Sequence, residues 1–145
     1  KKELITSNFN ISKLETLQSE IFWNKIKNLE FLSGTKNNIF RIVIPPSECI
    51  QLIYQLPKKF KYFLDWGGSL IWMEACELSE RLFDSIRTKV VKHGGYISMI
   101  KHSDDLPYVE DVFTIDTNKF NITQSIKKSF DPKRILNPGK MYTGI

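Results

Sequence analysis

The order of its short apolar runs and amphipathic stretches constrains this chain most strongly. Four runs rich in β-branched and aromatic residues predict strands, and they are Ile39–Ile44, Tyr62–Trp66, Leu70–Glu74 and Tyr96–Ile100. Apolar residues at helical spacing separate the first run from the second and the third from the fourth. This β-α-β-β-α-β order predicts an α+β fold, a ferredoxin-like antiparallel sheet with both helices on one face.

Turn and capping residues lie at the boundaries of these elements. Pro46 suits the first turn of the first helix, and Gly67-Gly68 predicts a tight turn between two antiparallel strands. Ser79 is expected to cap the second helix at its N-terminus. His93, followed by Gly94-Gly95, is expected to end this helix, where the histidine would act as a cation at the helix C-terminus.

Additional helices are expected before and after this core along the chain. Ser12–Glu15 has the S-x-x-E form of a capping box and predicts an N-terminal helix that starts at about Ser12 and ends near Ser33-Gly34. Residues 101–120 are expected to form a loop with a short strand at Val109–Ile115. Asn121 is expected to cap a last helix that Asp131-Pro132 ends, and an irregular tail follows.

Length and composition indicate a single folded domain. The chain has 145 residues, of which 41% are hydrophobic, and residues 1–145 are expected to form one domain. No apolar run approaches the roughly 18 to 20 residues of a membrane span. Cys49 and Cys76 fit neither a disulfide framework nor a zinc site. The chain begins Lys1-Lys2-Glu3 without an initiator methionine, so we expect it to be a piece of a longer protein.

Several classes of site lack support in the sequence. The two histidines, His93 and His102, have no further ligands at metal-binding spacing, so no metal is expected. There is no Gly-x-Ser-x-Gly and no phosphate-binding loop motif, which argues against a self-contained enzyme. The net charge of +5 and the predicted sheet keep two alternatives open. These are a nucleic-acid-binding module, although the aromatic motif of RNA-recognition domains is missing, and a domain that binds a small regulatory ligand.

The last stretch of the chain carries the most specific motif. This motif is the string FDPKRILNPGKMY, residues Phe130–Tyr142. A helix cannot continue through its two prolines, Pro132 and Pro138, and Pro138-Gly139 predicts a tight turn. This string resembles the closing motif of the FAD-linked oxidase C-terminal domain, a family of vanillyl-alcohol-oxidase-type flavoproteins. Within that superfamily, Leu64–Trp72, Phe22–Ile26 and His93–Tyr96 look like the E subunits of bacterial glycolate oxidases.

The resemblance implies a cap domain that covers a flavin held by a preceding FAD-binding domain, which is absent from this chain. The implied reaction is oxidation of glycolate to glyoxylate, with FAD as the cofactor. The implied partners are a flavin-containing D subunit and an iron-sulfur F subunit, in the cytoplasm at the inner face of the cell membrane; no nucleic acid is among them.

The resemblance also assigns candidate residues. Asn137, Pro138, Gly139 and Lys140 are carried over as flavin-side contacts, and no catalytic residue is assigned. Trp66 and Trp72 in the predicted hairpin are candidates for the interface with the missing domain. The chain lacks the histidine-rich metal motif of related D-type subunits. Because the parts that hold FAD are expected in the preceding domain, we expect the isolated chain to be colourless and inactive.

Overall fold

The computed structural model describes residues 12–32, 36–103, 113–140 and 142–144. By its contacts the chain divides into two units, Lys1–Gly34 and Thr35–Ile145. The first contains the helix α2 (Thr16–Lys27), and the second contains the sheet and the remaining helices.

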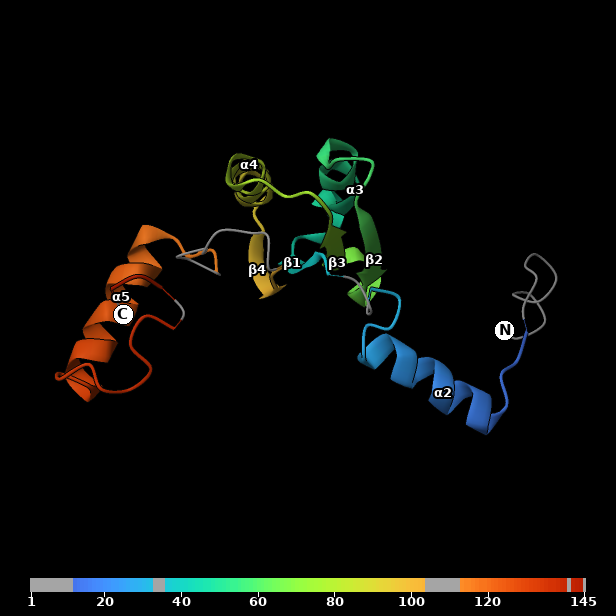
Figure 1. The fold of residues 1–145 in the computed structure, drawn as a ribbon, viewed down its shortest axis with the longest axis horizontal. Coiled ribbons are helices and arrows are strands. Elements are labelled where there is room, and N and C mark those ends of the chain that lie inside the picture. Colours follow the sequence, from blue (N-terminus) through green and yellow to red (C-terminus); the bar gives the residue numbers. More distant parts are fainter. Residues whose placement is uncertain (1–11, 33–35, 104–112, 141, 145) are drawn as a thin grey trace. The chain divides into compact units, whose positions relative to one another are not determined.

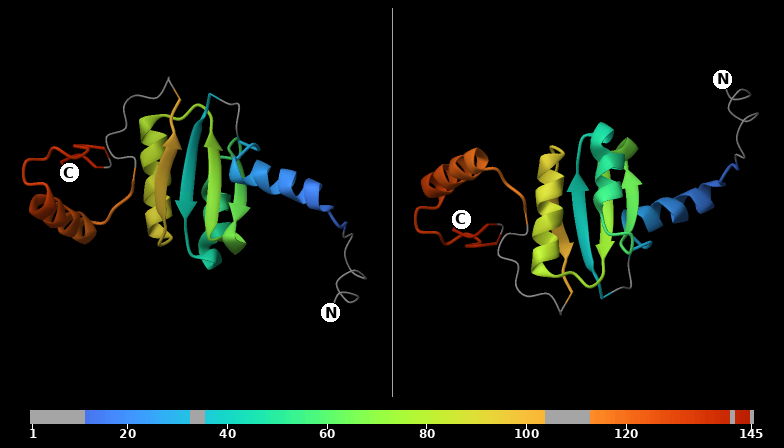
Figure 2. Two further views of the ribbon diagram at one scale, coloured as in Figure 1. Left: turned by 90° about the horizontal axis from the view of Figure 1, so that it is seen from below. Right: turned by 90° about the horizontal axis from the view of Figure 1, so that it is seen from above.

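The sheet has four antiparallel strands in the order β2-β3-β1-β4 (Figure 2). The strands are β1 (Asn38–Val43), β2 (Lys61–Asp65), β3 (Leu70–Ala75) and β4 (Tyr96–Lys101). The predicted hairpin is formed by β2 and β3, but only β3 is central, because β2 lies at the edge of the sheet. All four predicted strands are confirmed.

Two helices cover one face of this sheet. They are α3 (Pro46–Gln55) and α4 (Glu80–Lys92), and both lie on the same side of the strands in Figure 1. The α+β fold and its ferredoxin-like β-α-β-β-α-β order are therefore confirmed. A further helix, α5 (Thr117–Phe130), follows the sheet along the chain, as α2 precedes it.

The hydrophobic core lies between the sheet and these two helices. Alternate residues of the strands point into it and are almost fully buried, for example Phe40, Ile42, Ile71, Met73 and Ile97. The helices contribute the side chains of Leu52, Phe83, Ile86 and Val90. The Phe40 and Phe83 rings stack with their centroids 5.3 Å apart, which joins β1 directly to α4.

The ends of the two core helices confirm the expected caps. The Ser79 hydroxyl accepts a hydrogen bond from the Leu82 amide at 3.2 Å. His93 is the C-cap of α4, and its Nδ1 lies 2.7 Å from the Glu48 carboxylate in the first turn of α3. This contact connects the C-terminus of α4 to the N-terminal turn of α3.

Two predicted helix starts are wrong, and the capping groups explain both. The N-terminal helix starts at Thr16 rather than Ser12, because Glu15 and Gln18 form the reciprocal capping box. The last helix starts at Thr117 rather than Asn121, because the Asp116 carboxylate accepts a hydrogen bond from the Lys119 amide. The predicted strand at Val109–Ile115 lies partly outside the described residues, and Phe113 makes a single bridge to Ser98.

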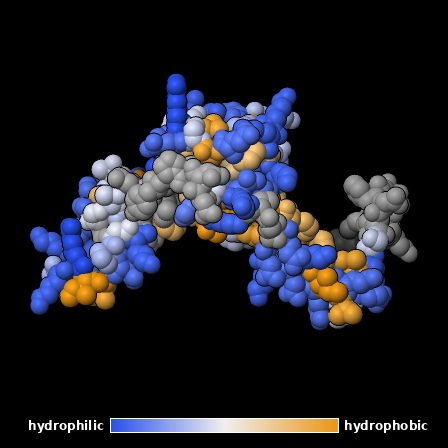
Figure 3. Space-filling view, viewed as in Figure 1, coloured by the Kyte–Doolittle hydropathy of each residue, from blue (hydrophilic) through white to orange (hydrophobic). Residues whose placement is uncertain are grey.

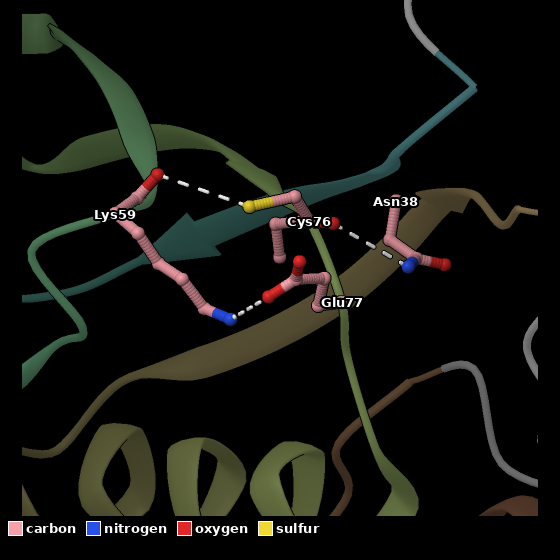
Figure 4. Close-up of polar contacts among 5 residues, drawn as sticks. Asn38, Lys59, Cys76 and Glu77 are labelled. Carbon is pink, nitrogen blue, oxygen red and sulfur yellow. Dashed lines mark hydrogen bonds and ion pairs between the residues drawn. The ribbon is translucent and has the colours of Figure 1, made fainter.

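Polar contacts hold the end of β3 (Figure 4). Lys59 and Glu77 form an ion pair at 2.6 Å, and the Cys76 thiol points to the Lys59 carbonyl. The buried Asn38 side chain donates to the Ala75 carbonyl at 3.4 Å and accepts from the Ser103 amide at 2.9 Å. One carboxamide on β1 therefore connects the chain that leaves β3 with the chain that leaves β4.

Candidate functional site

The face of the sheet opposite α3 and α4 carries the first group of candidate residues. Arg41, Trp72 and Phe63 lie side by side in register across β1, β3 and β2, and they alternate with core residues. The Arg41 guanidinium lies 5.3 Å from the centre of the Trp66 ring, a cation–π contact. This open face therefore presents a cation set among aromatic rings.

Backbone geometry places Trp66 beside Arg41. The turn between β2 and β3 is a 3-10 turn over Trp66–Gly68, in which Trp66 itself has a positive φ of 52°. The Asp65 carboxylate accepts a hydrogen bond from the Trp66 amide at 2.7 Å. Trp66 is 59% exposed, and Trp72 is partly buried, so neither predicted interface residue lies in the layer beneath the helices.

A cavity of about 590 Å³ adjoins this open face. Its lining includes Arg41, Tyr96 and Ser98 from the sheet and Lys119 and Tyr142 from the C-terminal segment. Thr114 holds that segment against β4, because its amide donates to the Ile97 carbonyl at 3.1 Å. The size falls within the range of small-molecule pockets. The Lys119 ammonium is paired with Asp116 at 3.4 Å, so it is the Arg41 guanidinium that favours an anionic ligand.

The C-terminal tail is organised around one carboxylate. Asp131, at the end of α5, accepts hydrogen bonds from the Ile135 and Leu136 amides at 2.9 Å each and pairs with the Lys127 ammonium at 2.8 Å. The same ammonium donates to the Leu136 carbonyl. These contacts, the one from Lys127 foremost, lower the pKa of the Asp131 carboxyl to about 2.

The tail returns to the start of α5. Tyr142 packs against Phe113 and Phe120, with ring centroids 6.1 and 6.2 Å apart. The tail is thus anchored at both ends, by Asp131 and by Tyr142.

The predicted flavin-side residues lie on the exposed part of this tail. The Lys140 amide donates to the Asn137 carbonyl at 3.3 Å, and Asn137 and Gly139 have φ of 44° and 67°, which confirms the predicted turn. All four residues, Asn137 to Lys140, are exposed. The carboxamide of Asn137 and the ammonium of Lys140 are therefore accessible to another surface.

Two residues of these surfaces, Arg41 and Asp131, were not predicted from the sequence. Arg41 has a sequence signal, since it is the single charged residue in the apolar run Ile39–Ile44. The sequence predicts only that Asp131 ends a helix. Its role in the tail does not follow from the sequence, because the Ile135 and Leu136 amides reach its carboxylate only after the tail has turned. Cys49 is buried, and this burial raises the pKa of its thiol, as expected of a core cysteine.

Two further observations concern the described residues alone. No three acidic, cysteine or histidine side chains in that part of the chain are grouped so that they could hold a metal ion. None of its helices combines the length and the apolar character needed to span a bilayer.

The fold and these surfaces define an α+β domain with a covered face and an open face. Residues 72–141 match the family described as FAD linked oxidases, C-terminal domain. The match begins within β3 and includes α4, β4, α5 and most of the tail. It supports an FAD-linked oxidase C-terminal domain, hence an oxidoreductase family that uses FAD. No curated protein and no solved structure matches the chain.

Proposed function

We propose that this chain is the cap domain of an FAD-dependent 2-hydroxy-acid oxidoreductase subunit, with glycolate as the substrate. The family match over residues 72–141 carries the FAD-linked part of this proposal, because it includes all but the last residue of the closing motif Phe130–Tyr142. The choice of glycolate follows only from the resemblance of Leu64–Trp72, Phe22–Ile26 and His93–Tyr96 to glycolate oxidase E subunits. The proposed partners are the FAD-binding domain that would precede this chain, a flavin-containing D subunit and an iron-sulfur F subunit. The proposed location is the cytoplasm, at the inner face of the membrane through the complex.

The open face would provide part of the substrate site. A 2-hydroxy acid carries one carboxylate, and Arg41 beside the 590 Å³ cavity supplies a guanidinium that suits it. Trp66 beneath the guanidinium limits its movement and excludes water from one side. FAD, when bound, would accept the hydride from C2 of the substrate.

The tail would contact the cofactor side. A carboxamide donates and accepts hydrogen bonds, and an ammonium stabilises negative charge, so Asn137 and Lys140 fit the polar edge of an isoalloxazine ring. Both side chains are exposed, and the turn that presents them is held by its own hydrogen bond. This chemistry supports the assignment of residues 137–140 to the cofactor side.

Exposed apolar surface supports a covering domain. Helix α5 has no buried residue, and large apolar side chains remain exposed on it and on the tail, namely Ile122, Ile126, Phe130, Ile135 and Leu136. Figure 3 shows a hydrophobic patch at one end of α5. Such a stripe is typical of an interface, and the proposed occupant is the FAD-binding domain of the same subunit.

The complete polypeptide encoded by the gene provides the test. We expect it to purify with bound flavin and to reduce a dye acceptor when glycolate is added, whereas residues 1–145 alone are colourless. Arg41→Gln should raise the KM for glycolate about tenfold or more with the flavin retained, the loss of one charge-assisted contact. Asn137→Ala with Lys140→Ala should weaken flavin retention, and Lys133→Ala serves as the matched control. A complete polypeptide without flavin, or one inert to 2-hydroxy acids, would contradict the proposal.

A second candidate function is a nucleic-acid-binding module. Arg41 with Trp66, Trp72 and Phe63 on an open sheet face is the kind of surface on which bases stack. Salt-dependent binding of single-stranded RNA that Trp72→Ala removes would favour this function. A ligand-stabilised dimer without RNA binding would instead favour a regulatory domain.

A further inference from the structure

A second cavity lies within the C-terminal segment. It measures about 520 Å³ and is formed between one face of α5 and the tail that returns along it. Asn121, Gln124 and Lys128 come from the helix, and Asp131 and Arg134 come from its end and the tail. The residues proposed for the cofactor side, 137–140, are not part of this lining.

The charges of this cavity do not balance. Among the described lining residues, the one carboxylate is Asp131, and it is already engaged by Lys127 and by two backbone amides. Lys128 and Arg134 have no ionic partner within the described part of the chain. Two positive charges therefore remain for a ligand.

The backbone of the tail places one of these cations on the cavity wall. Arg134 has a φ of 50°, a backbone conformation that residues other than glycine rarely adopt. It is held there because its amide donates to the Asp131 carbonyl at 3.0 Å, while the next two amides donate to the Asp131 carboxylate. These three hydrogen bonds hold the backbone of Arg134 in a strained conformation, and its side chain lines the cavity.

We propose that this cavity binds the phosphate group of a small organic phosphate. A phosphate monoester carries close to two negative charges at pH 7 and offers three acceptor oxygens. The Arg134 guanidinium binds two of these oxygens in a bidentate manner, and the Lys128 ammonium supplies the second charge. The carboxamides of Asn121 and Gln124 add neutral donors.

The volume decides between a free ion and a larger ligand. A cavity of about 520 Å³ lies within the range that small molecules occupy, and a single phosphate ion leaves most of it empty. The organic part of the ligand occupies the remaining space against the polar helix face. This site is independent of the proposed oxidoreductase function.

Calorimetric titration of the 145-residue chain tests the site. The probes are inorganic phosphate, pyrophosphate and AMP, each at one ionic strength set with sodium chloride. We expect AMP to bind more tightly than inorganic phosphate. Arg134→Gln and Lys128→Gln should each weaken binding about tenfold. The matched control Lys133→Gln removes the same charge from a neighbouring residue outside the cavity and should change affinity less than about twofold.

Thermal melts confirm that each variant is folded, and Arg134→Gly offers a second variant that removes both the charge and the strained conformation. It should weaken AMP binding about tenfold or more, as Arg134→Gln does, without lowering the melting temperature. Equal weakening by Lys133→Gln, or no binding of any phosphate probe above that of chloride, would overturn the proposal. Equal affinity for AMP and inorganic phosphate would overturn the proposal that the ligand has an organic part.

Discussion

At the scale of single residues, Asp131 shows how one carboxylate orders an irregular tail. Residues Asn137–Lys140 are all exposed, so burial of apolar surface does not account for their order. In the structure, Asp131 satisfies two backbone amides and one ammonium within the segment itself. The exposed turn is therefore presented by a local hydrogen-bond network.

Replacing this carboxylate should release the tail. Asp131→Asn keeps the shape of the side chain but removes the charge that holds Lys127 and both amides. We expect the Ile135 and Leu136 amides to exchange faster with solvent, as measured by NMR. The matched control Asp84→Asn, on the exposed surface of α4, should leave both amides unchanged, and equal exchange in the two variants would contradict this role.

The pH dependence of the tail follows from the same group. Folding lowers the pKa of the Asp131 carboxyl from its ordinary 3.8 to about 2. The stabilisation is therefore complete above about pH 4 and is lost as the pH falls through about 2. The two tail amides should lose protection with that midpoint. Loss near pH 4 or above would show that the carboxylate is not held as described.

Gly95 is the residue whose replacement should most directly disturb the contact between β1, α4 and β4. A Cβ at this position would lie 2.7 Å from the Val43 carbonyl oxygen and 3.1 Å from a Val90 methyl. Gly95→Ala should lower the free energy of unfolding by about 1 to 3 kcal/mol in a denaturant titration. Ser85→Ala, exposed on α4, is the control and should change it by less than about 0.5 kcal/mol. A Gly95→Ala variant as stable as the control would show that the strands yield to the extra methyl.

At the scale of elements, the sequence was sufficient where periodicity and capping agreed. The strands β1 to β4 and the helices α3 and α4 follow the predicted order, because their apolar periods differ and a proline, a glycine or, between β3 and α4, the capping Ser79 marks each boundary. The predicted starts of α2 and α5 were wrong because several residues near each helix N-terminus could act as the cap. Which of these residues caps the helix depends on which side chain reaches a backbone amide. Periodicity does not predict which residues come into contact after folding. Arg41 contacts Trp66, which is distant along the chain. Asp131 contacts the Ile135 and Leu136 amides only because the tail turns.

The N-cap of α4 gives a prediction for one element. The Ser79 hydroxyl satisfies the Leu82 amide at 3.2 Å, and an alanine leaves that amide without this partner. Ser79→Ala should lower the free energy of unfolding by about 1 kcal/mol, and Ser79→Asn should restore most of it. Chemical denaturation of the three proteins measures the difference. Equal stability of the serine and alanine proteins would show that water replaces the cap without cost.

At the scale of the whole molecule, the two units differ in how they are stabilised. The core cluster draws all its buried residues from the second unit, Thr35–Ile145. Helix α2 in the first unit has no buried residue, and Leu17, Ile21 and Trp23 are exposed on it. Because burial of apolar surface is the main stabilising contribution, the second unit should contain the folding information for the sheet.

Removing residues 1–34 tests this division. The chain of residues 35–145 keeps β1 to β4, α3 and α4 together with the stacked Phe40 and Phe83 rings. We expect it to unfold in one cooperative transition, at a midpoint close to that of the 145-residue chain, when followed by circular dichroism. Phe40→Ala in either chain should lower the free energy of unfolding by about 3 to 5 kcal/mol, because the side chain is fully buried in the common core. If the truncated chain does not fold, or if Phe40→Ala destabilises the two chains to different extents, the N-terminal unit contributes to the core and the two units are not independent.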